Sequence, residues 1–425
     1  MSLRNYHLNI PMRIKSSTLA DIVFILFFSS SLFTAGLMIF LNSQTVAEYI
    51  VCGVNYFLLL CLYLLSPRKY IKLDFWILFS IIVSLFGLTL FLRPDMLYWY
   101  TRTTYGALDY VFFPNEAIYG YLFIRLIDDP KRLFRNLKIS SWLMYLYFFY
   151  QIYAATKRGY WIGVSKTTAQ AEMSYSVAFG YQVMLYTLPF LYDALLKKNK
   201  WDILGAAIGL YMMLTQGSRG PFLFLCVFLV LFAFNHFRHS RKKIIYSAIA
   251  VLLLMFLYLF YDTLLAWLSL FLSNAGFSSR IISSLVEGTI SADSGRSDIW
   301  AVAIQAIIDN PWGHGPMGSQ PIVFHLVPAG YPHSVILEVL IDFGVIIGSA
   351  ILIFLFVNAF KMLFKEENAA WLPCFMVFFC TACQLFISLC YWSSTGFWAS
   401  IAVCVNCYYA NKRNSKSVTK RRFIR

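Results

Sequence analysis

Residues 294–348 begin with SGRSDIW (294–300), turn at NPWGHGP (310–316) and end with PHSVILEVLIDFGVIIG (332–348). The first part is polar and the last part is an apolar run with helical length, so the stretch passes from water into a hydrophobic environment. It carries Arg296 and three histidines, His314, His325 and His333. A chain that is 60% hydrophobic does not need these residues to build its core. We therefore predict that this stretch carries the functional site.

The rest of the chain predicts a membrane protein. Apolar runs of about twenty residues recur through its 425 residues, and each is long enough to cross the roughly 30 Å hydrocarbon core of a bilayer. We expect an all-α integral membrane protein, a single polytopic domain over residues 1–425 with about twelve transmembrane helices. The expected spans are 20–42, 47–66, 73–92, 104–127, 139–154, 176–196, 202–216, 220–236, 244–262, 334–358, 370–390 and 396–410.

The placement of the basic residues predicts the topology. Most of the 35 Lys and Arg residues lie in the two tails and in connectors 68–72, 125–138, 197–200, 238–243 and 361–365. By the positive-inside rule these segments are cytoplasmic, so both termini are expected inside, with 411–425 as a basic cytoplasmic tail. The net charge of +15 then reflects topology and contact with anionic lipids, not nucleic-acid binding. Two outer connectors are long, 155–175 and 263–333. The second, between spans nine and ten, is the expected large extracytoplasmic catalytic loop.

The sequence Thr215-Gln-Gly-Ser-Arg-Gly-Pro221 lies between two apolar runs, which places Arg219 near the outer membrane face. Gly217 and Gly220 allow a tight turn, and Pro221 suits the first turn of a new helix. An ordinary interpretation is a chain reversal whose arginine reaches the lipid headgroups. The functional interpretation is an anion site, because a guanidinium offers a planar pair of donors that matches phosphate oxygens.

A second arginine follows in SGRSDIW. Ser294 suits the cap of a helix that contains Trp300 and ends at Asn310-Pro311, which puts Arg296 in its first turn. One interpretation is a surface ion pair with Asp293 or Asp298. The other is that Arg219 and Arg296 together clamp a diphosphate on the outer face.

His333 stands where the loop enters the tenth span. Histidine titrates near neutral pH, so it can take a proton from a sugar hydroxyl, although a histidine at a helix start is often a capping or packing residue. Glu338 and Asp342 follow in the same span, and ionisable residues at membrane depth are usually functional or paired. Gly344 and Gly348, with GxxxG spacing, are expected to let a neighbouring helix approach closely.

Two other patterns invite a functional interpretation. Cys380-x-x-Cys383 and Cys404-x-x-Cys407 have a zinc-ribbon spacing, but both pairs lie in apolar spans, where cysteine behaves as a small hydrophobe. We expect no metal site. Asp109 and Glu116, seven residues apart, are expected on one face of the fourth span, as polar ties in the bundle interior or as a proton relay. The aromatic run Tyr98-Trp99-Tyr100 is expected at the outer membrane interface.

The order of these motifs resembles the O-antigen ligase and polymerase superfamily of bacterial membrane glycosyltransferases. The resemblance rests on SRG opening a span, then R-x-x-x-W, NPWGHG, and a His leading into a span with GVIIG. It covers residues 212–356, whereas the first half is similar only as a set of hydrophobic helices. Many family members have Asn after this His, where Ser334 stands here. His325 and His314 are therefore kept as substitutes for His333.

The resemblance implies a GT-C-like helical bundle and an inverting transferase that needs no metal and no cofactor. By this resemblance, Arg219 and Arg296 bind the diphosphate, and His333 acts as the base. Further candidates for substrate binding are His314, His325, Arg280 and Glu338. The implied partners are an undecaprenyl-diphosphate-linked oligosaccharide, membrane lipids, a chain-length regulator and a flippase, with no nucleic acid. The implied location is the bacterial cytoplasmic (inner) membrane.

We expect a polymerase for O-antigen or capsule repeat units, which transfers a growing carrier-linked glycan to the nonreducing end of a new carrier-linked unit. Ten residues separate His333 from Gly344, a spacing that resembles the polymerase pattern. The close alternative is an O-antigen ligase, whose acceptor is the lipid A core of lipopolysaccharide. A transporter or flippase of lipid-linked sugars would instead show matched halves and a charged central path. The remaining alternative is a non-enzymatic membrane assembly subunit.

Overall fold

The computed structural model describes residues 15–163, 171–173, 176–216, 219–237, 296–327 and 329–422, with isolated positions between 248 and 270. Its regular structure is almost entirely helical. The exception is a two-stranded antiparallel ribbon, β1 (Trp161–Gly163) with β2 (Ala171–Met173), in which Ile162 pairs with Glu172. The ribbon lies in the long connector 155–175, and the rest of the described regular structure is helical, as expected.

The first three expected spans are present as helices, one of them broken. Residues 16–41 form α1 (Ser16–Phe28) and α2 (Ser30–Leu41), which meet at an angle of 69° at the buried Ser29. Serine-rich positions are common sites of such kinks. The next two spans are α3 (Gln44–Leu65) and α5 (Leu73–Leu92), joined by the short α4 (Pro67–Tyr70).

The expected fourth span, 104–127, is wrong as a continuous helix. After α6 (Met96–Tyr100), the chain forms α7 (Ala107–Tyr110) and α8 (Tyr119–Arg125), with turns between them. Pro114-Asn115 interrupts the pattern, because proline disfavours helical backbone at the residue before it and removes an amide donor. Asp109 and Glu116 therefore do not share a helix face. Asp109 instead accepts a hydrogen bond from the Tyr105 amide at 3.2 Å.

Four long helices follow, and they agree with the expected spans five to eight. They are α9 (Pro130–Arg158), α10 (Val177–Lys197), α11 (Lys200–Gln216) and α12 (Arg219–Phe237). The expected ninth span, 244–262, lies outside the described residues apart from single positions.

The C-terminal part contains the remaining elements. They are α16 (Arg296–Asp309), α17 (Ser319–Val323), α18 (Val335–Phe364), η1 (Glu366–Asn368), α19 (Leu372–Ala382), η2 (Cys383–Phe386) and α20 (Thr395–Arg422). The expected eleventh span is thus shorter than 370–390. Helix α20 continues from the twelfth expected span into the basic tail.

Within the described residues, four helices are long and apolar enough to cross a membrane: α3, α5, α12 from Gly220, and α18. The bent pair of α1 and α2 makes up to five. The chain is therefore a multi-pass membrane protein, since a helix satisfies its backbone polar groups internally and can cross lipid. The larger number of spans and the GT-C-like arrangement stay predictions.

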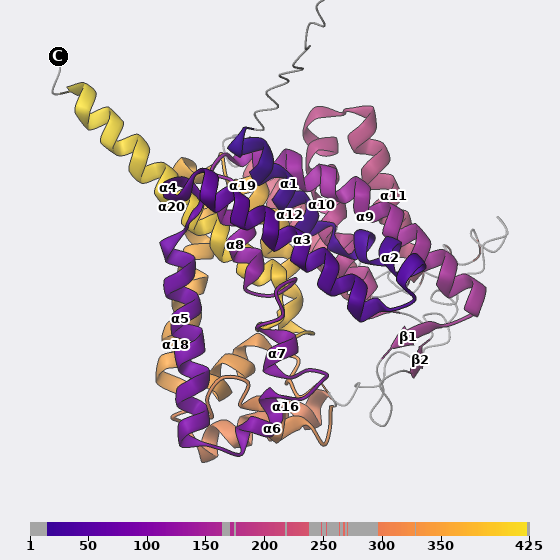
Figure 1. The fold of residues 1–425 in the computed structure, drawn as a ribbon, viewed down its shortest axis with the longest axis vertical. Coiled ribbons are helices and arrows are strands. Elements are labelled where there is room, and N and C mark those ends of the chain that lie inside the picture. The colour runs from indigo at the N-terminus through magenta and orange to yellow at the C-terminus, as the bar shows by residue number, and fades with distance from the viewer. Residues whose placement is uncertain are drawn as a thin grey trace, which may run out of the picture.

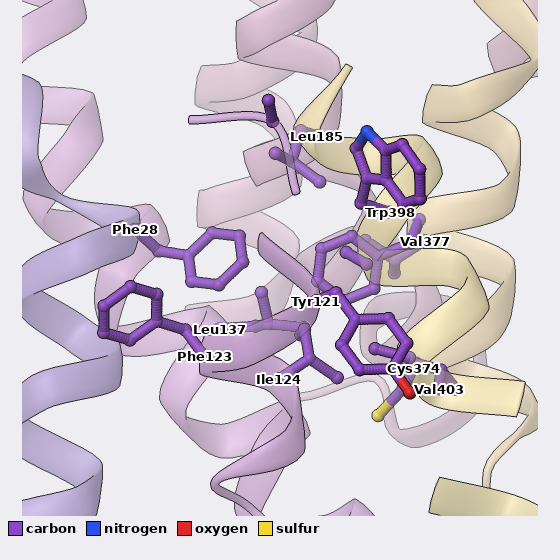
Figure 2. Packing of buried hydrophobic residues seen from close by; sticks show 14 of the residues in the cluster. Phe28, Tyr121, Phe123, Ile124, Leu137, Leu185, Cys374, Val377, Trp398 and Val403 are labelled. Atoms are coloured by element: carbon purple, nitrogen blue, oxygen red, sulfur yellow. The ribbon is translucent and has the colours of Figure 1, made fainter. Parts of the chain in front are cut away.

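The core is centred on α8, whose residues 120–125 are all buried. Its Phe123 stacks on Phe27 of α1 with ring centroids 4.1 Å apart. Figure 2 shows side chains from α1, α8, α9, α10, α19 and α20 converging here. Lipid tails are as apolar as these side chains, so close packing, more than exclusion from water, holds the bundle together.

Ion pairs gather in connectors that were expected on the cytoplasmic side. Four basic residues each contact an aspartate there: Arg125 with Asp74 at 2.8 Å, Lys72 with Asp128 at 3.1 Å, Arg132 with Asp21 at 2.7 Å, and Lys138 with Asp193 at 2.9 Å. Much of the basic charge in these connectors is therefore paired within the protein. Figure 1 places α4 and the C-terminus at one end of the molecule, with α6, α7 and α16 at the other. The functional stretch thus lies at the opposite end from the ion pairs.

Candidate active site

Helix α16 carries Arg296 and Trp300 one helical turn apart. The sequence predicted a helix that ends at Asn310-Pro311, and α16 ends at Asp309. The Trp300 Nε1 donates a hydrogen bond to the Pro332 carbonyl oxygen at 2.9 Å. Residues at i and i+4 lie on one side of a helix, so Arg296 and Trp300 both face the loop that ends at His333. The R-x-x-x-W spacing therefore joins α16 to the start of α18.

His333 is half-buried, and the charge of Arg296 acts on its ring. Burial, and then the charge of Arg296, lower the pKa of the His333 imidazole to about 4, so it is neutral at physiological pH. Its Nδ1 is buried and has no hydrogen-bond partner within the part of the chain that the structure describes. Its ring lies 4.7 Å from that of Tyr331, edge to face. A neutral imidazole with a free ring nitrogen is able to accept a proton.

The backbone of His333 is held in an unusual conformation. Its φ of +53° lies in the left-handed region, which residues other than glycine adopt rarely. Such conformations persist only where the surrounding structure enforces them, and they are concentrated at functional sites. Here the Trp300 bond to Pro332 and the start of α18 at Val335 restrain the loop on both sides.

The first turn of α12 lies near the same arginine. A Cβ built on Gly220 would clash with the Tyr181 hydroxyl of α10, so this turn packs directly on Tyr181. Tyr181 also interacts electrostatically with Arg296. The two arginine motifs predicted to act together therefore share Tyr181 as a neighbour. Arg219 is the first residue of α12, and its side chain lies outside the described residues.

Helix α18 is broken at Gly344, and the NPWGHGP loop fills the break. Gly344 has φ +74° and ψ 174°, which interrupts the helical hydrogen bonds. The amides of His314 and Gly315 donate to the carbonyls of Ile341 and Asp342 at 2.7 and 2.9 Å. On the other side of the break, the Val345 amide donates to the Pro311 carbonyl at 2.8 Å. The loop thus supplies partners for backbone groups that the break leaves free.

This contact corrects the expectation for the GxxxG pair. A Cβ on Gly344 would meet the backbone of Pro311 and Trp312, while one on Gly348 would meet Val339 and Leu340 of the same helix. In the described part of the chain, the glycine spacing therefore admits a loop and a kink, and not a neighbouring helix. Gly313, with φ +97°, completes the fit, because a Cβ there would lie 2.5 Å from the Gly344 nitrogen.

The two acids of α18 fasten the surrounding segments. The Asp342 carboxylate accepts hydrogen bonds from the Gly318 amide at 3.0 Å, the Tyr391 hydroxyl at 2.6 Å and the Trp392 Nε1 at 2.8 Å. Glu338 is 1% exposed and accepts from the Cys390 thiol at 2.6 Å and the Tyr391 amide at 3.3 Å. Both acids are thus hydrogen-bonded within the protein, and a substrate-binding role for Glu338 stays a prediction.

The remaining predicted site residues are dispersed. The His314 Nε2 lies 3.2 Å from the Ala306 carbonyl, and its own carbonyl accepts from Arg93 at 3.2 Å, so it ties the loop to α16 and α5. His325 is exposed after α17. Arg280 lies outside the described residues. The charge of Arg296 thus acts on His333, whereas the contacts of His314 are with Ala306 and Arg93, and the substrate-binding roles of His314 and His325 stay predictions.

Two residues that the sequence did not single out have unsatisfied polar atoms near this part of the chain. The Arg102 Nη1 and the Gln320 Oε1 are both buried and meet no hydrogen-bond partner among the described residues. The only sequence signal near Arg102 was the aromatic run before it. No sequence motif marked Gln320, because a single amide side chain in a loop of mixed composition forms no recognisable spacing.

The cysteines and acids do not form a metal centre in the described residues. No group of three or more His, Cys, Asp or Glu side chains there is arranged to hold an ion. Cys380, Cys383 and Cys407 are buried free thiols, and the Cys407 Sγ contacts the Asn368 Oδ1 at 3.1 Å. A hollow of about 500 Å³ between Leu73 and Leu88 is lined only by α5 and contains none of the predicted site residues.

Comparison with known families agrees with this part of the chain. Residues 204–354 match the family model described as O-Antigen ligase. The segment includes the first turn of α12, all of α16 and the break in α18. The resemblance predicted from the motifs is confirmed for this segment. No curated protein and no solved structure matches the chain.

Proposed function

Because residues 204–354 match the O-antigen ligase family, whose members are membrane glycosyltransferase-like enzymes, we propose that this chain is a polysaccharide polymerase. It transfers a growing O-antigen or capsule glycan from undecaprenyl diphosphate to the nonreducing end of a lipid-linked repeat unit. The reaction takes place at the outer face of the bacterial cytoplasmic membrane, with both termini inside.

The reaction needs one base and charge stabilisation. An acceptor hydroxyl oxygen attacks the anomeric carbon of the donor while the bond from that carbon to the diphosphate oxygen breaks. His333 takes the hydroxyl proton, and undecaprenyl diphosphate leaves with the bonding electron pair. Arg219 and Arg296 neutralise the charge that grows on the diphosphate, which is the effect that usually contributes most to such catalysis. The bond changes balance without any further reactant.

The observation that supports this proposal most directly is the electrostatic interaction between Arg296 and His333. The charge of Arg296 acts on the His333 ring, and the Trp300 bond to Pro332 fixes the two segments together. A cation beside a neutral base matches a site that binds an anionic leaving group and deprotonates a hydroxyl.

The preference for a polymerase over a ligase rests on the spacing between His333 and Gly344. Gly344 is the break in α18 where the NPWGHGP loop docks. The spacing therefore sets the length of helix between His333, the proposed base, and this break. The alternative, an O-antigen ligase that delivers the glycan to lipid A core, uses the same donor chemistry. Products distinguish the two.

The test is complementation of a strain that lacks this gene. Wild type, Arg219→Ala, Arg296→Ala and His333→Ala are expressed at checked levels, with the exposed Arg158→Ala as a matched control from the same face. We expect the three site variants to lose the glycan ladder and the control to keep it. Wild-type ladders from all three would overturn the proposed roles.

The product that accumulates in the deletion strain identifies the step. Single repeat units on the final acceptor, without longer chains, support a polymerase. Full-length chains retained on the carrier identify a ligase. Intact lipid-linked units held on the cytoplasmic side identify a flippase.

A further inference from the structure

Arg102 presents an unsatisfied guanidinium within an aromatic surrounding. Its Cζ lies 4.3 Å from the Phe324 ring centroid and 5.3 Å from that of Trp99, and those two rings contact each other edge to face at 5.3 Å. The rings hold the guanidinium in place, while its Nη1 is buried and no described residue offers it a hydrogen bond. A buried charged donor without a partner costs free energy unless something else accepts its proton.

Gln320 has an unsatisfied acceptor, whereas Arg102 has an unsatisfied donor. Gln320 is 2% exposed, and its Nε2 donates to the Tyr105 carbonyl, while its Oε1 has no hydrogen-bond donor in the described ranges. Tyr105, with φ +65°, also interacts electrostatically with Arg102 and with Tyr331. Tyr105 therefore links an unsatisfied donor, an unsatisfied acceptor and the loop of His333.

The same group of residues reaches the predicted base. A Cβ on Gly330 would lie 3.0 Å from the Gln320 Cα, so the chain segment before His333 passes directly over Gln320. Tyr331 follows and contacts the His333 ring at 4.7 Å. The His333 Nδ1 is also buried and, like the Arg102 Nη1 and the Gln320 Oε1, lacks a partner among the residues that the structure describes.

We propose that Arg102, Gln320 and His333 belong to one sugar-binding site, in which Arg102 and Gln320 hold the acceptor glycan whose hydroxyl His333 deprotonates. This rests on the proposed function and adds the acceptor side to it. A sugar hydroxyl both accepts and donates a hydrogen bond, so neighbouring hydroxyls satisfy Arg102 and Gln320 together. A diphosphate satisfies only the arginine, because it has no proton to offer the Gln320 oxygen.

The test measures binding to the purified full-length protein in lipid nanodiscs. One probe is the repeat-unit oligosaccharide released by mild acid from the strain's own lipid-linked intermediate, and the other is inorganic pyrophosphate. We expect Arg102→Met and Gln320→Met to weaken oligosaccharide binding about tenfold or more, as for the loss of a hydrogen bond to a charged or buried group. Pyrophosphate binding is expected to stay within twofold of wild type (~0.4 kcal/mol).

The matched control is Arg158→Met. Arg158 is an exposed arginine of the same predicted face, stacked over Tyr160 at 6.0 Å, and its loss should leave both probes unaffected. Arg102→Lys keeps the charge and stem, so it serves if the methionine variant does not fold. A monodisperse elution profile and an unchanged melting temperature identify the folded variants.

The outcomes separate this inference from the proposed function. No oligosaccharide binding to wild type, unchanged binding in folded Arg102 variants, or a loss confined to pyrophosphate would each overturn the acceptor site. None of these results affects the roles of Arg296 and His333, which the glycan ladder tests. One result would overturn only the role of His333 as the base. In that result, His333→Ala keeps the glycan ladder, while Arg102→Met still weakens oligosaccharide binding.

Discussion

The indole nitrogen of Trp300 donates a hydrogen bond to the carbonyl oxygen of Pro332, 2.9 Å away. This bond joins two segments that are 32 residues apart in sequence. It fixes the residue directly before His333 to the helix that carries Arg296. The relative position of the proposed base and the proposed cation therefore depends on one side chain that takes no part in the chemistry.

Trp300→Phe tests this positioning. Phenylalanine keeps most of the apolar contact and removes the donor, at a cost of about 1 kcal/mol. If the lost bond leaves His333 less well positioned, the same free energy adds to the activation barrier. Turnover then falls roughly fivefold, with little change in the donor KM. Assays with a lipid-linked repeat unit measure both constants. Trp312→Phe is the matched control, because the Trp312 side chain is 78% exposed. Equal effects of the two substitutions would contradict the positioning role.

Gly344→Ala tests the break in α18. Alanine at φ +74° and ψ 174°, a conformation that is essentially restricted to glycine, costs about 1–3 kcal/mol, and its Cβ would clash with the Pro311 and Trp312 backbone. We expect a lower melting temperature and loss of the glycan ladder, because the NPWGHGP loop is displaced. Gly87→Ala in α5 is the control, since a Cβ there meets nothing within 4 Å. A Gly344→Ala protein as stable and active as the control would show that the break is dispensable.

The fall of kcat/KM at low pH, the acid limb of the pH profile, measures the pKa of His333. Burial and the charge of Arg296 lower the pKa of its imidazole from 6.5 to about 4. The neutral form is the base, so kcat/KM of the free enzyme should hold from pH 7 to pH 5 and fall only near pH 4. Removing the Arg296 charge removes one cause of the lowered pKa. The normalised acid limb of Arg296→Gln should therefore move to higher pH. A wild-type limb at pH 6.5 would contradict this environment for His333.

The same shift affects stability in a defined direction. The unfolded histidine binds a proton below about pH 6.5, while the folded one does not until about pH 4. Stability is therefore lost as pH falls through this window and is unaffected above it. His333→Gln should remove this part of the pH dependence. Melting curves of the two proteins at pH 7 and pH 5 measure the difference, and parallel curves would exclude it.

Asp74→Asn tests the ion pair at the predicted cytoplasmic end. The Arg125 guanidinium is 5% exposed and contacts Asp74 at 2.8 Å, and the Tyr121 hydroxyl donates to the same carboxylate at 2.5 Å. Breaking a buried pair from one side typically costs about 3–5 kcal/mol. We expect a marked fall in melting temperature.

The exposed pair of Lys365 and Glu367 is the control for this experiment. Its side chains are 54% and 60% exposed, and such pairs contribute about 0–1 kcal/mol. Glu367→Gln should therefore melt near the wild-type temperature. If Asp74→Asn melts there too, the Arg125 pair contributes no more than a surface pair.

The sequence by itself determined the membrane character and most of the helices. Expected spans such as 73–92 and 220–236 agree with α5 and α12, because about twenty apolar residues in lipid have few alternatives to a helix. The helix that begins at Arg296 and ends before Asn310 was also predictable from its end signals. The motif order identified the family segment for the same local reasons.

Only the tertiary structure decided how these pieces meet. The fourth expected span failed because Pro114-Asn115 outweighs its hydropathy, and the GxxxG pair failed because Gly344 accommodates a loop instead of a helix. Local patterns report the periodicity of one segment, whereas the proximity of Arg296 to His333 and the unsatisfied atoms of Arg102 and Gln320 depend on contacts between distant segments. Hydropathy determined which segments are able to enter a membrane, and long-range packing determined which polar groups meet.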